Sequence, residues 1–101
     1  MSTSASESTA ITAVGLTTDE DTISVDLTDG RTIAAPLAWY PRLLHGTPEE
    51  RNHWRWIGGG TGIHWPDLDE DLSIENLLAG KPSGESRSSL SKWLATRSTA
   101  I

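Results

Sequence analysis

The clearest pattern along the chain lies in residues 22–27, where apolar and polar side chains alternate strictly. The three apolar residues face one way and the polar residues face the other, which is typical of a strand that is buried on one side. β-Branched residues predict a short strand before it, over residues 11–16, and another strand follows it over residues 31–35.

The register of the hairpin between the last two strands follows from the same alternation. A two-residue turn would pair Val25 with Ala34 and place Ile33 on the polar face. A three-residue loop over residues 28–30, with Gly30 in the left-handed conformation, pairs Val25 with Ile33 instead. Because a slip of one residue moves every side chain to the opposite face, burial favours the three-residue loop with a glycine bulge.

Two short helices are predicted to follow these strands. The first spans residues 37–45 and has Pro41 in its first turn. A capping box predicts the start of the second helix at residues 47–50. Thr47 is the N-cap, Pro48 occupies the first helical position, and the Glu50 side chain is expected to accept from the N-cap N–H. The local signal for this second helix is the strongest in the chain.

A second hairpin is predicted from another alternating segment. Residues 53–57 place Trp54 and Trp56 on one face, and a glycine-rich turn leads to a returning strand over residues 63–65. The following residues, 67–71, are expected to form an acidic loop.

Together these elements predict an α+β domain over residues 10–80, with about five short antiparallel strands in two hairpins and two or three short helices. Its last helix covers residues 74–79 and is capped by Ser73. Residues 1–9 are expected to be a disordered N-terminus. Residues 81–101 are expected to form a Ser-rich linker with a short amphipathic tail helix.

Composition narrows the class of protein. The chain has 101 residues and no cysteine, which excludes disulfides, thiolate zinc sites and cysteine nucleophiles. No apolar run approaches the roughly 20 residues of a membrane helix. The N-terminal residues lack the basic start and the apolar stretch of a secretory signal. We therefore expect a cytoplasmic protein.

The charge is unevenly distributed along the chain. Residues 1–80 carry a net charge of −9, and residues 81–101 carry +3. An acidic body repels phosphate backbones, so direct nucleic-acid binding is disfavoured. A basic stripe of Arg42, Arg51 and Arg55 is conceivable, but a solvated or ion-paired face is the simpler interpretation.

Metal binding has only weak candidates. Asp67, Asp69 and Asp71 have the opening spacing of a calcium loop, but leucines replace the required glycine and glutamate later in the pattern. His53 and His64 are the other candidates. They are predicted to be neighbours across the second hairpin, where an exposed pair without a further role is the simpler interpretation.

No motif for catalysis or for a cofactor is present. The glycines of residues 58–62 are followed by a strand rather than by a helix with a lysine, so they predict a hairpin turn and not a phosphate loop. The chain has no Gly-x-Ser-x-Gly elbow to mark a serine nucleophile. We expect no catalytic residue, no cofactor and no enzymatic activity.

The region from Thr22 to Gly80 closely resembles the bacterial domain of unknown function 2442 family. The resemblance rests on Asp29-Gly30-Arg31, Pro36-Leu37-Ala38-Trp39-Tyr40-Pro41-Arg42-Leu43, Thr47-Pro48-Glu49-Glu50-Arg51, Trp56-Ile57-Gly58-Gly59-Gly60, Gly62-Ile63-His64-Trp65-Pro66, Asp69-Glu70-Asp71-Leu72-Ser73 and Leu77-Leu78. It implies a small α+β fold and no activity. Some relatives are encoded beside a small protein in an arrangement that resembles a toxin–antitoxin pair.

These observations favour a non-catalytic protein-interaction domain that presents tryptophan rings and its acidic loop. The candidate partner-binding residues are Trp39, Tyr40, Arg42 and Trp93. The expected partner is a small basic toxin-like protein, with this chain as its antitoxin. A homodimer is a further hypothesis, and a small-ligand or metal-binding domain is the alternative function.

Overall fold

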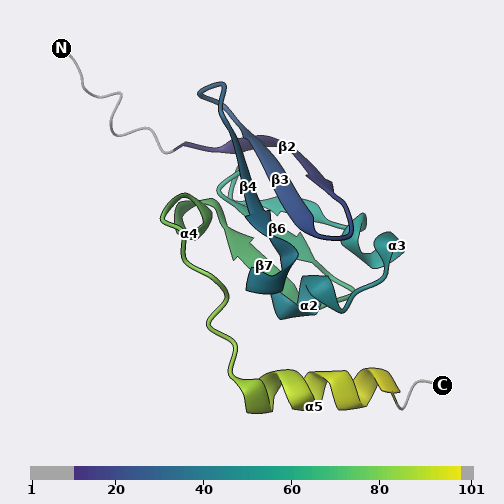
Figure 1. Cartoon of the computed structure of the whole chain (residues 1–101). Coiled ribbons are helices and arrows are strands. Elements are labelled where there is room, and N and C mark those ends of the chain that lie inside the picture. The colour runs from purple at the N-terminus through teal and green to yellow at the C-terminus, as the bar shows by residue number, and fades with distance from the viewer. Residues whose placement is uncertain (1–10, 99–101) are drawn as a thin grey trace.

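The computed structural model describes residues 11–98, which form two three-stranded antiparallel sheets and several short helices (Figure 1). The first sheet contains β2 (Ala13–Thr18), β3 (Thr22–Leu27) and β4 (Thr32–Pro36). The second contains β5 (Arg55–Ile57), β6 (Gly62–Trp65) and β7 (Glu70–Ser73). The helices are η1 (Leu37–Trp39), α2 (Pro41–Leu44), α3 (Pro48–Arg51), α4 (Ile74–Leu78) and α5 (Arg87–Ser98). The predicted disordered segment, residues 1–9, lies outside the described residues.

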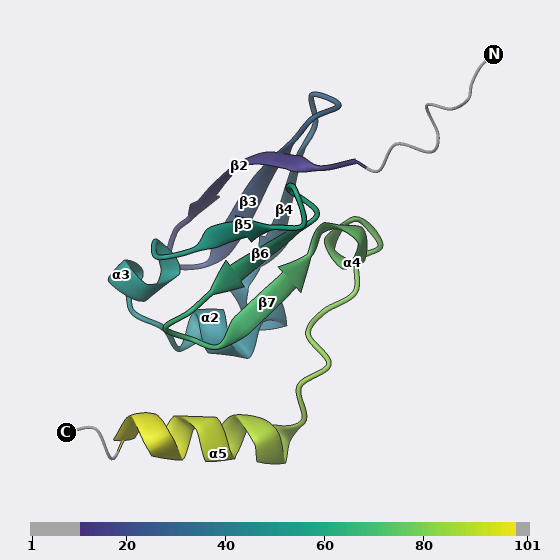
Figure 2. The ribbon, with the colours of Figure 1, turned by 180° about the vertical axis from the view of Figure 1, so that it is seen from behind.

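The two sheets form two layers, with the second sheet in front of the first in Figure 2. Helix α2 lies at one end of the layers, and α5 lies beyond it, outside both sheets (Figure 1). No described helix has the length and apolar character needed to cross a membrane. The two antiparallel sheets with separate helices confirm the broad α+β class.

The predicted register of the first sheet is confirmed. Val25 is paired with Ile33 across β3 and β4. The loop between them places Gly30 at φ +92°, and its N–H donates to the carbonyl of Leu27 at 3.1 Å. Strand β2 differs from the prediction, because it runs from residue 13 to residue 18 and carries an irregularity after Ala13.

The predicted helix over residues 37–45 is divided in two. The 3-10 helix η1 ends before Tyr40, whose backbone is at φ −129° and ψ 82°, and α2 begins at Pro41. The helix breaks at Tyr40 because proline disfavours helical geometry in the residue that precedes it. The capping box of α3 is confirmed: the Thr47 hydroxyl accepts from the Glu50 N–H, and the Glu50 carboxylate accepts from the Thr47 N–H.

The prediction of five strands in two hairpins is wrong, because the acidic loop ends in a sixth strand, β7. This strand pairs with β6, placing Leu72 opposite Ile63 and Glu70 opposite Trp65. Aspartate and glutamate are rare in strands, so the local composition hides the alternation. The turn that precedes β7 contains Asp69 at φ +52°, a conformation that aspartate tolerates better than most residues.

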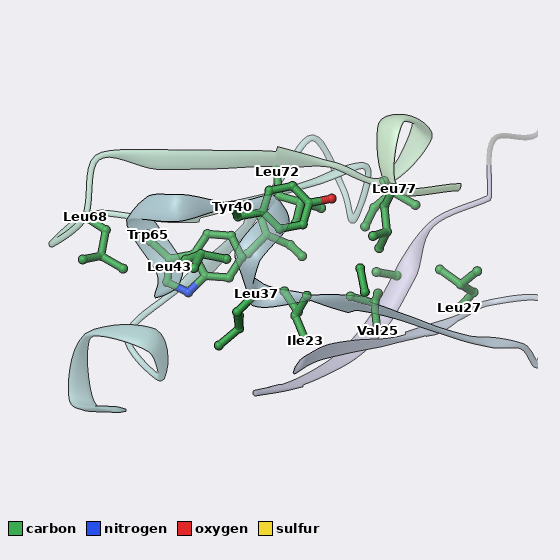
Figure 3. Close-up of a cluster of buried hydrophobic side chains, with 14 residues drawn as sticks. Ile23, Val25, Leu27, Leu37, Tyr40, Leu43, Trp65, Leu68, Leu72 and Leu77 are labelled. Atoms are coloured by element: carbon green, nitrogen blue, oxygen red, sulfur yellow. The ribbon is translucent and has the colours of Figure 1, made fainter. Parts of the chain in front are cut away.

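The hydrophobic core lies between the two sheets (Figure 3). Trp65 is fully buried there, with 0% of its surface exposed, whereas Trp54, Trp56, Trp39 and Trp93 are partly buried around the core. The rings of Trp54 and Trp56 meet edge to face at 4.7 Å between centroids, so they share one side of the chain as the alternation predicts. Of the five tryptophans, Trp65 is therefore the one that lies fully inside the core.

A buried arginine connects Trp65 to the two helices at the end of the sheets. The Arg51 guanidinium donates to the carbonyls of Leu43 at 3.2 Å and Gly46 at 2.6 Å. The Arg51 carbonyl in turn accepts the indole N–H of Trp65 at 3.0 Å. Arg51 is only 7% exposed, so it stabilises the interior rather than a basic surface.

We expect Arg51→Met to lower the free energy of unfolding by about 2–4 kcal/mol, because it removes charged donors from two buried carbonyls. Urea denaturation followed by tryptophan fluorescence measures this change. The control is Arg55→Met on an exposed position of β5, for which we expect a change within about 0.5 kcal/mol. Equal effects of the two substitutions would contradict this role of Arg51.

Candidate functional site

The structure brings together two of the four predicted partner-binding residues. The guanidinium carbon of Arg42 lies 5.1 Å from the centre of the Trp93 ring. Trp39 is half-buried elsewhere, and its carbonyl accepts from the N–H of Ser83. Tyr40 is 4% exposed and belongs to the core, so its ring is not presented at the surface of this structure.

Helix α5 is attached to the domain by a small group of charged and aromatic residues that we call the α5 seam: Arg42, Glu50, Glu85, Trp93 and Arg97. The Trp93 ring contacts two guanidinium groups: the guanidinium carbon of Arg42 lies 5.1 Å from the ring centre, and that of Arg97 lies 4.8 Å from it. Arg42 forms an ion pair with Glu85 at 2.6 Å, and Arg97 forms one with Glu50 at 2.7 Å. The α5 seam therefore joins residues that are more than forty positions apart in the chain.

Both ion pairs in the α5 seam are held in the charged state. The hydrogen bond from Arg42 is the main cause that lowers the pKa of Glu85, and burial acts in the opposite direction. The hydrogen bond from Arg97 likewise lowers the pKa of Glu50. The Arg97–Glu50 pair is the more exposed of the two, at 27% and 23% of side-chain surface. Ion pairs at such exposure stabilise by only about 0.2–1 kcal/mol and weaken with salt.

Three members of the α5 seam were not identified from the sequence. Glu50 was assigned only to the capping box, but its carboxylate also accepts from Arg97. Glu85 is the one acid in the basic C-terminal segment, and Arg97 follows Trp93 by four residues, which places both on one face of a helix. These two features are the sequence signals for the seam.

A second polar site lies between β7 and the segment of residues 81–84, and we call it the Tyr40–Glu70 pocket. It has a volume of about 170 Å³, and its lining includes Tyr40, Glu70, Ser73, Asn76, Lys81 and Ser83. Tyr40 lines the pocket, but its hydroxyl oxygen is buried in the interior and has no hydrogen-bond partner among the described residues. An unsatisfied buried hydroxyl is unfavourable, so this group lowers the stability of the folded state.

Burial raises the pKa of Glu70 to about 7. The negative charges of Glu85, Asp71 and Asp69 contribute to this raised pKa, and the charge of Arg42 acts against them. Glu70 has this environment because its side chain shares the core face of β7 with Leu72. Sequence analysis placed Glu70 in a solvated loop and therefore missed it.

The predicted metal candidates are separated by their own contacts. The His53 ring nitrogen lies 2.7 Å from a carboxylate oxygen of Asp67, and His64 contacts Asp71 in the same way. Asp69 lies instead 3.6 Å from Arg42. Within residues 11–98 no group of three or more such side chains is arranged to hold a metal ion.

The predicted cross-strand pairing of His53 with His64 is wrong. Arg55 is the residue opposite His64, because the turn pairs Ile57 with Gly62 and thereby sets the register of β5 with β6. The three arginines that were weighed as a basic stripe are dispersed, in agreement with the simpler interpretation of a solvated or ion-paired face. Arg51 is buried, Arg42 is engaged in the α5 seam, and only Arg55 is exposed.

An open groove of about 970 Å³ lies between the second sheet and α4. Its lining is mainly aliphatic and includes Ile57 and Leu78. Of its two acidic residues, Asp71 contacts His64, and Glu75 lies in the first turn of α4. No set of polar groups converges in this groove to suggest chemistry.

Comparisons place the fold among uncharacterised proteins. The family model described as "Protein of unknown function (DUF2442)" matches residues 11–83. A crystal structure of a protein of unknown function from Rhodospirillum rubrum is similar at 29% identity and a TM-score of 0.67, covering 76% of this chain and 95% of that one. An uncharacterised protein from Chromobacterium violaceum shares the fold at 24% identity and a TM-score of 0.61, covering 85% and 75%. No curated protein matches the chain.

We expect Trp93→Ala to loosen α5 without unfolding the domain. The substitution removes two cation–π contacts of about 0.5–1 kcal/mol each, so amide hydrogen exchange in α5 should accelerate about 5- to 30-fold. Exchange in β3 and β6 should be unchanged. The control is Lys92→Ala, an exposed residue of the same helix; the same acceleration in this variant would contradict the role of the ring.

We expect the stability contribution of Glu70 to depend on pH. Its pKa is raised from 4.5 to about 7 on folding, so the folded state binds the proton more tightly and the free energy of unfolding falls as the pH rises through this range. Glu70→Gln removes this loss. After allowance for solvent screening of the partly exposed carboxyl, the variant should gain about 1–2 kcal/mol near neutral pH and nothing in acid.

Urea denaturation at several pH values tests the expectation for Glu70. The control is Glu75→Gln, which changes an exposed carboxyl of α4. Its difference from the wild type should stay constant between about pH 4.5 and pH 7, the range over which the Glu70→Gln difference should grow. A Glu70→Gln difference that is equally constant would show that Glu70 titrates normally.

Proposed function

We propose that this chain, which belongs to the DUF2442 family of proteins of unknown function, is a non-catalytic protein-interaction domain. In this proposal the domain binds its partner through helix α5. The observation that carries this proposal is the α5 seam. Helix α5 lies outside both sheets (Figure 1) and is attached through one ring and two ion pairs. Trp93 also packs against the edge of the core, so a partner that releases α5 must replace this packing as well as the polar contacts.

The energetics of α5 favour its release to a partner. A helix of twelve residues is marginally stable by itself in water. The stacked arginines and the exposed Arg97–Glu50 pair contribute only about 0.2–1 kcal/mol each. Tryptophan and arginine are the residues that most often dominate binding energy at interfaces, and Trp93 and Arg97 lie together on α5.

The charge of the body favours a basic partner. Residues 1–80 carry a net charge of −9, which steers a positively charged protein toward the body of the domain beside α5 and repels nucleic acid. The more specific form of the proposal is an antitoxin-like protein that binds a small basic toxin-like protein encoded by a neighbouring gene. This form is supported by the charge and by the resemblance to the family. A cytoplasmic location and a homodimer stay predictions.

The non-catalytic part of the proposal is supported by the surroundings of the histidines. His53 and His64 lie on strands or loops at the surface and face aspartates that are themselves 44% and 67% exposed. A nucleophile requires a base held beside it by an orienting acid, usually in a site that excludes water. For the alternative function, binding of a small ligand, the supporting observation is the Tyr40–Glu70 pocket and not these histidines.

Binding of the neighbouring gene product, measured by calorimetry and by association kinetics, tests the proposal. We expect a one-to-one complex, and Trp93→Ala should weaken it by about 30-fold or more, the loss that accompanies removal of a strong interface anchor. Glu50→Gln keeps the capping box and removes the ion pair with Arg97, so it should release α5 and speed association. Glu49→Gln makes the same charge change at an exposed position of α3 and should leave the rate unaltered.

Two results would overturn the proposed function. One is the absence of a stoichiometric complex with the wild-type chain. The other is a Trp93→Ala variant that binds as tightly as the wild type while its circular dichroism shows a folded domain.

A further inference from the structure

We propose that helix α5 is a hinged arm, which opens at its C-terminal end while its N-terminal end stays attached through Glu85. This inference rests on the proposed role of α5 in binding and adds how the binding surface is uncovered. Two ion pairs of the α5 seam hold the two ends of this segment. We call the pair of Arg42 with Glu85 the root pair, and the pair of Arg97 with Glu50 the tip pair.

The two ion pairs lie at opposite ends of α5. Glu85 precedes the first residue of the helix by two positions, and Arg97 is the penultimate residue of the helix. The linker enters α5 at one end, and the other end lies on the side of the domain where α3 lies (Figure 1 and Figure 2). Because a helix rises about 1.5 Å per residue, roughly 18 Å separates the two attachments along the helix axis.

The root pair belongs to a buried network. The Arg42 guanidinium donates to the Glu85 carboxylate through contacts of 2.9, 3.0 and 2.6 Å. The Ser89 hydroxyl also donates to this carboxylate, at 2.8 Å. The Arg42 and Glu85 side chains are only 15% and 9% exposed. Since charge-assisted hydrogen bonds are strong and buried charges are little screened by salt, the root pair is the firmer attachment.

Backbone hydrogen bonds also hold the N-terminal end of α5. The Ser86 hydroxyl oxygen accepts the N–H of Ser89 at 3.1 Å, and the Ser86 carbonyl accepts the N–H of Leu90 at 3.0 Å. The linker before the helix is tied to the domain, because the Ser83 N–H donates to the carbonyl of Trp39 at 2.9 Å. A capped first turn and a tied linker keep the root in place.

The tip pair is the weaker attachment. Arg97 donates to the Glu50 carboxylate at 2.7 and 3.2 Å, and this pair is more exposed than the root pair. It lies in the last turn of the helix, where carbonyls lack intrahelical partners and the helix frays. A rotation about the root moves this end of α5 farther than the first turn. The tip pair therefore breaks first.

Opening of the tip uncovers two surfaces that face each other. Glu50 keeps its capping-box bond with the Thr47 N–H, so α3 does not have to unfold. Trp93 and Arg97 contact each other within α5, so they move together with the arm. The ring then leaves the edge of the core. The free Glu50 carboxylate fits a cationic side chain of the basic partner in place of Arg97, beside the uncovered ring of Trp93.

Spin labelling of the full chain, without a partner, tests this hinge. The chain has no cysteine, so Ala95→Cys provides a single labelling site near the tip. Ser88→Cys provides one near the root, where Ser88 and Arg42 line the same surface hollow. Both positions are exposed. The tip label should broaden the amide signals of α3, and the root label should broaden those of α2.

Glu50→Gln removes the charge of the tip pair and keeps the capping box. We expect it to raise the open population by up to about fivefold, as for the loss of an exposed ion pair. Broadening of the α3 signals should therefore fall while broadening of the α2 signals persists. Raising NaCl from about 0.1 M to about 1 M, which shortens the Debye length from about 10 Å to about 3 Å, should act in the same way. Glu49→Gln, at an exposed position of α3, is the charge-matched control and should change neither.

Glu85→Gln makes the matched change at the root. We expect it to reduce broadening from both labels, while the amide signals of β3 and β6 stay in place and show a folded domain. The hinge is overturned if Glu50→Gln or added salt reduces broadening from both labels together, or if Glu50→Gln behaves like Glu49→Gln. Root broadening that persists in Glu85→Gln would overturn the pivot as well. Because no partner is present, each of these failures concerns the mode of opening and is distinct from a failure of the proposed function.

Discussion

The domain depends on the buried connection between Trp65 and Arg51. Trp65 fills the space between the sheets, and its indole N–H is satisfied by the Arg51 carbonyl. The Arg51 side chain then holds the carbonyls at the end of α2. Because α2 and α3 are single turns that are unstable alone, this connection positions them against the second sheet. The positions of Tyr40 and Arg42 follow from it.

Arg42 connects the two polar sites that the helices position. Its guanidinium pairs with Glu85 and stacks on Trp93, and its charge lowers the pKa of Glu70. Glu85 acts on Glu70 in the opposite direction. Movement of α5 and of the segment before it therefore alters the charge balance in the Tyr40–Glu70 pocket. The α5 seam and the Tyr40–Glu70 pocket are thus linked through the charges of Arg42 and Glu85.

The elements that were predicted correctly rest on interactions between residues close in sequence. The register of β3 with β4 follows from the alternation around Val25 and from the conformation that Gly30 permits. The capping box at Thr47 is complete within four residues. The break before Pro41 was not predicted, but it is local too, because proline restricts the backbone of the residue that precedes it.

The sequence by itself determined the strands with clear alternation, the helix caps, the acidic body and the resemblance to an uncharacterised family, because each is encoded in neighbouring residues or in composition. Only the tertiary structure decided that Glu70 faces the core, that Tyr40 lacks a partner, and that Glu85 and Arg42 meet across forty-three positions. These outcomes depend on which surfaces the two sheets bury against each other. Contacts between distant residues leave no local pattern from which they can be predicted.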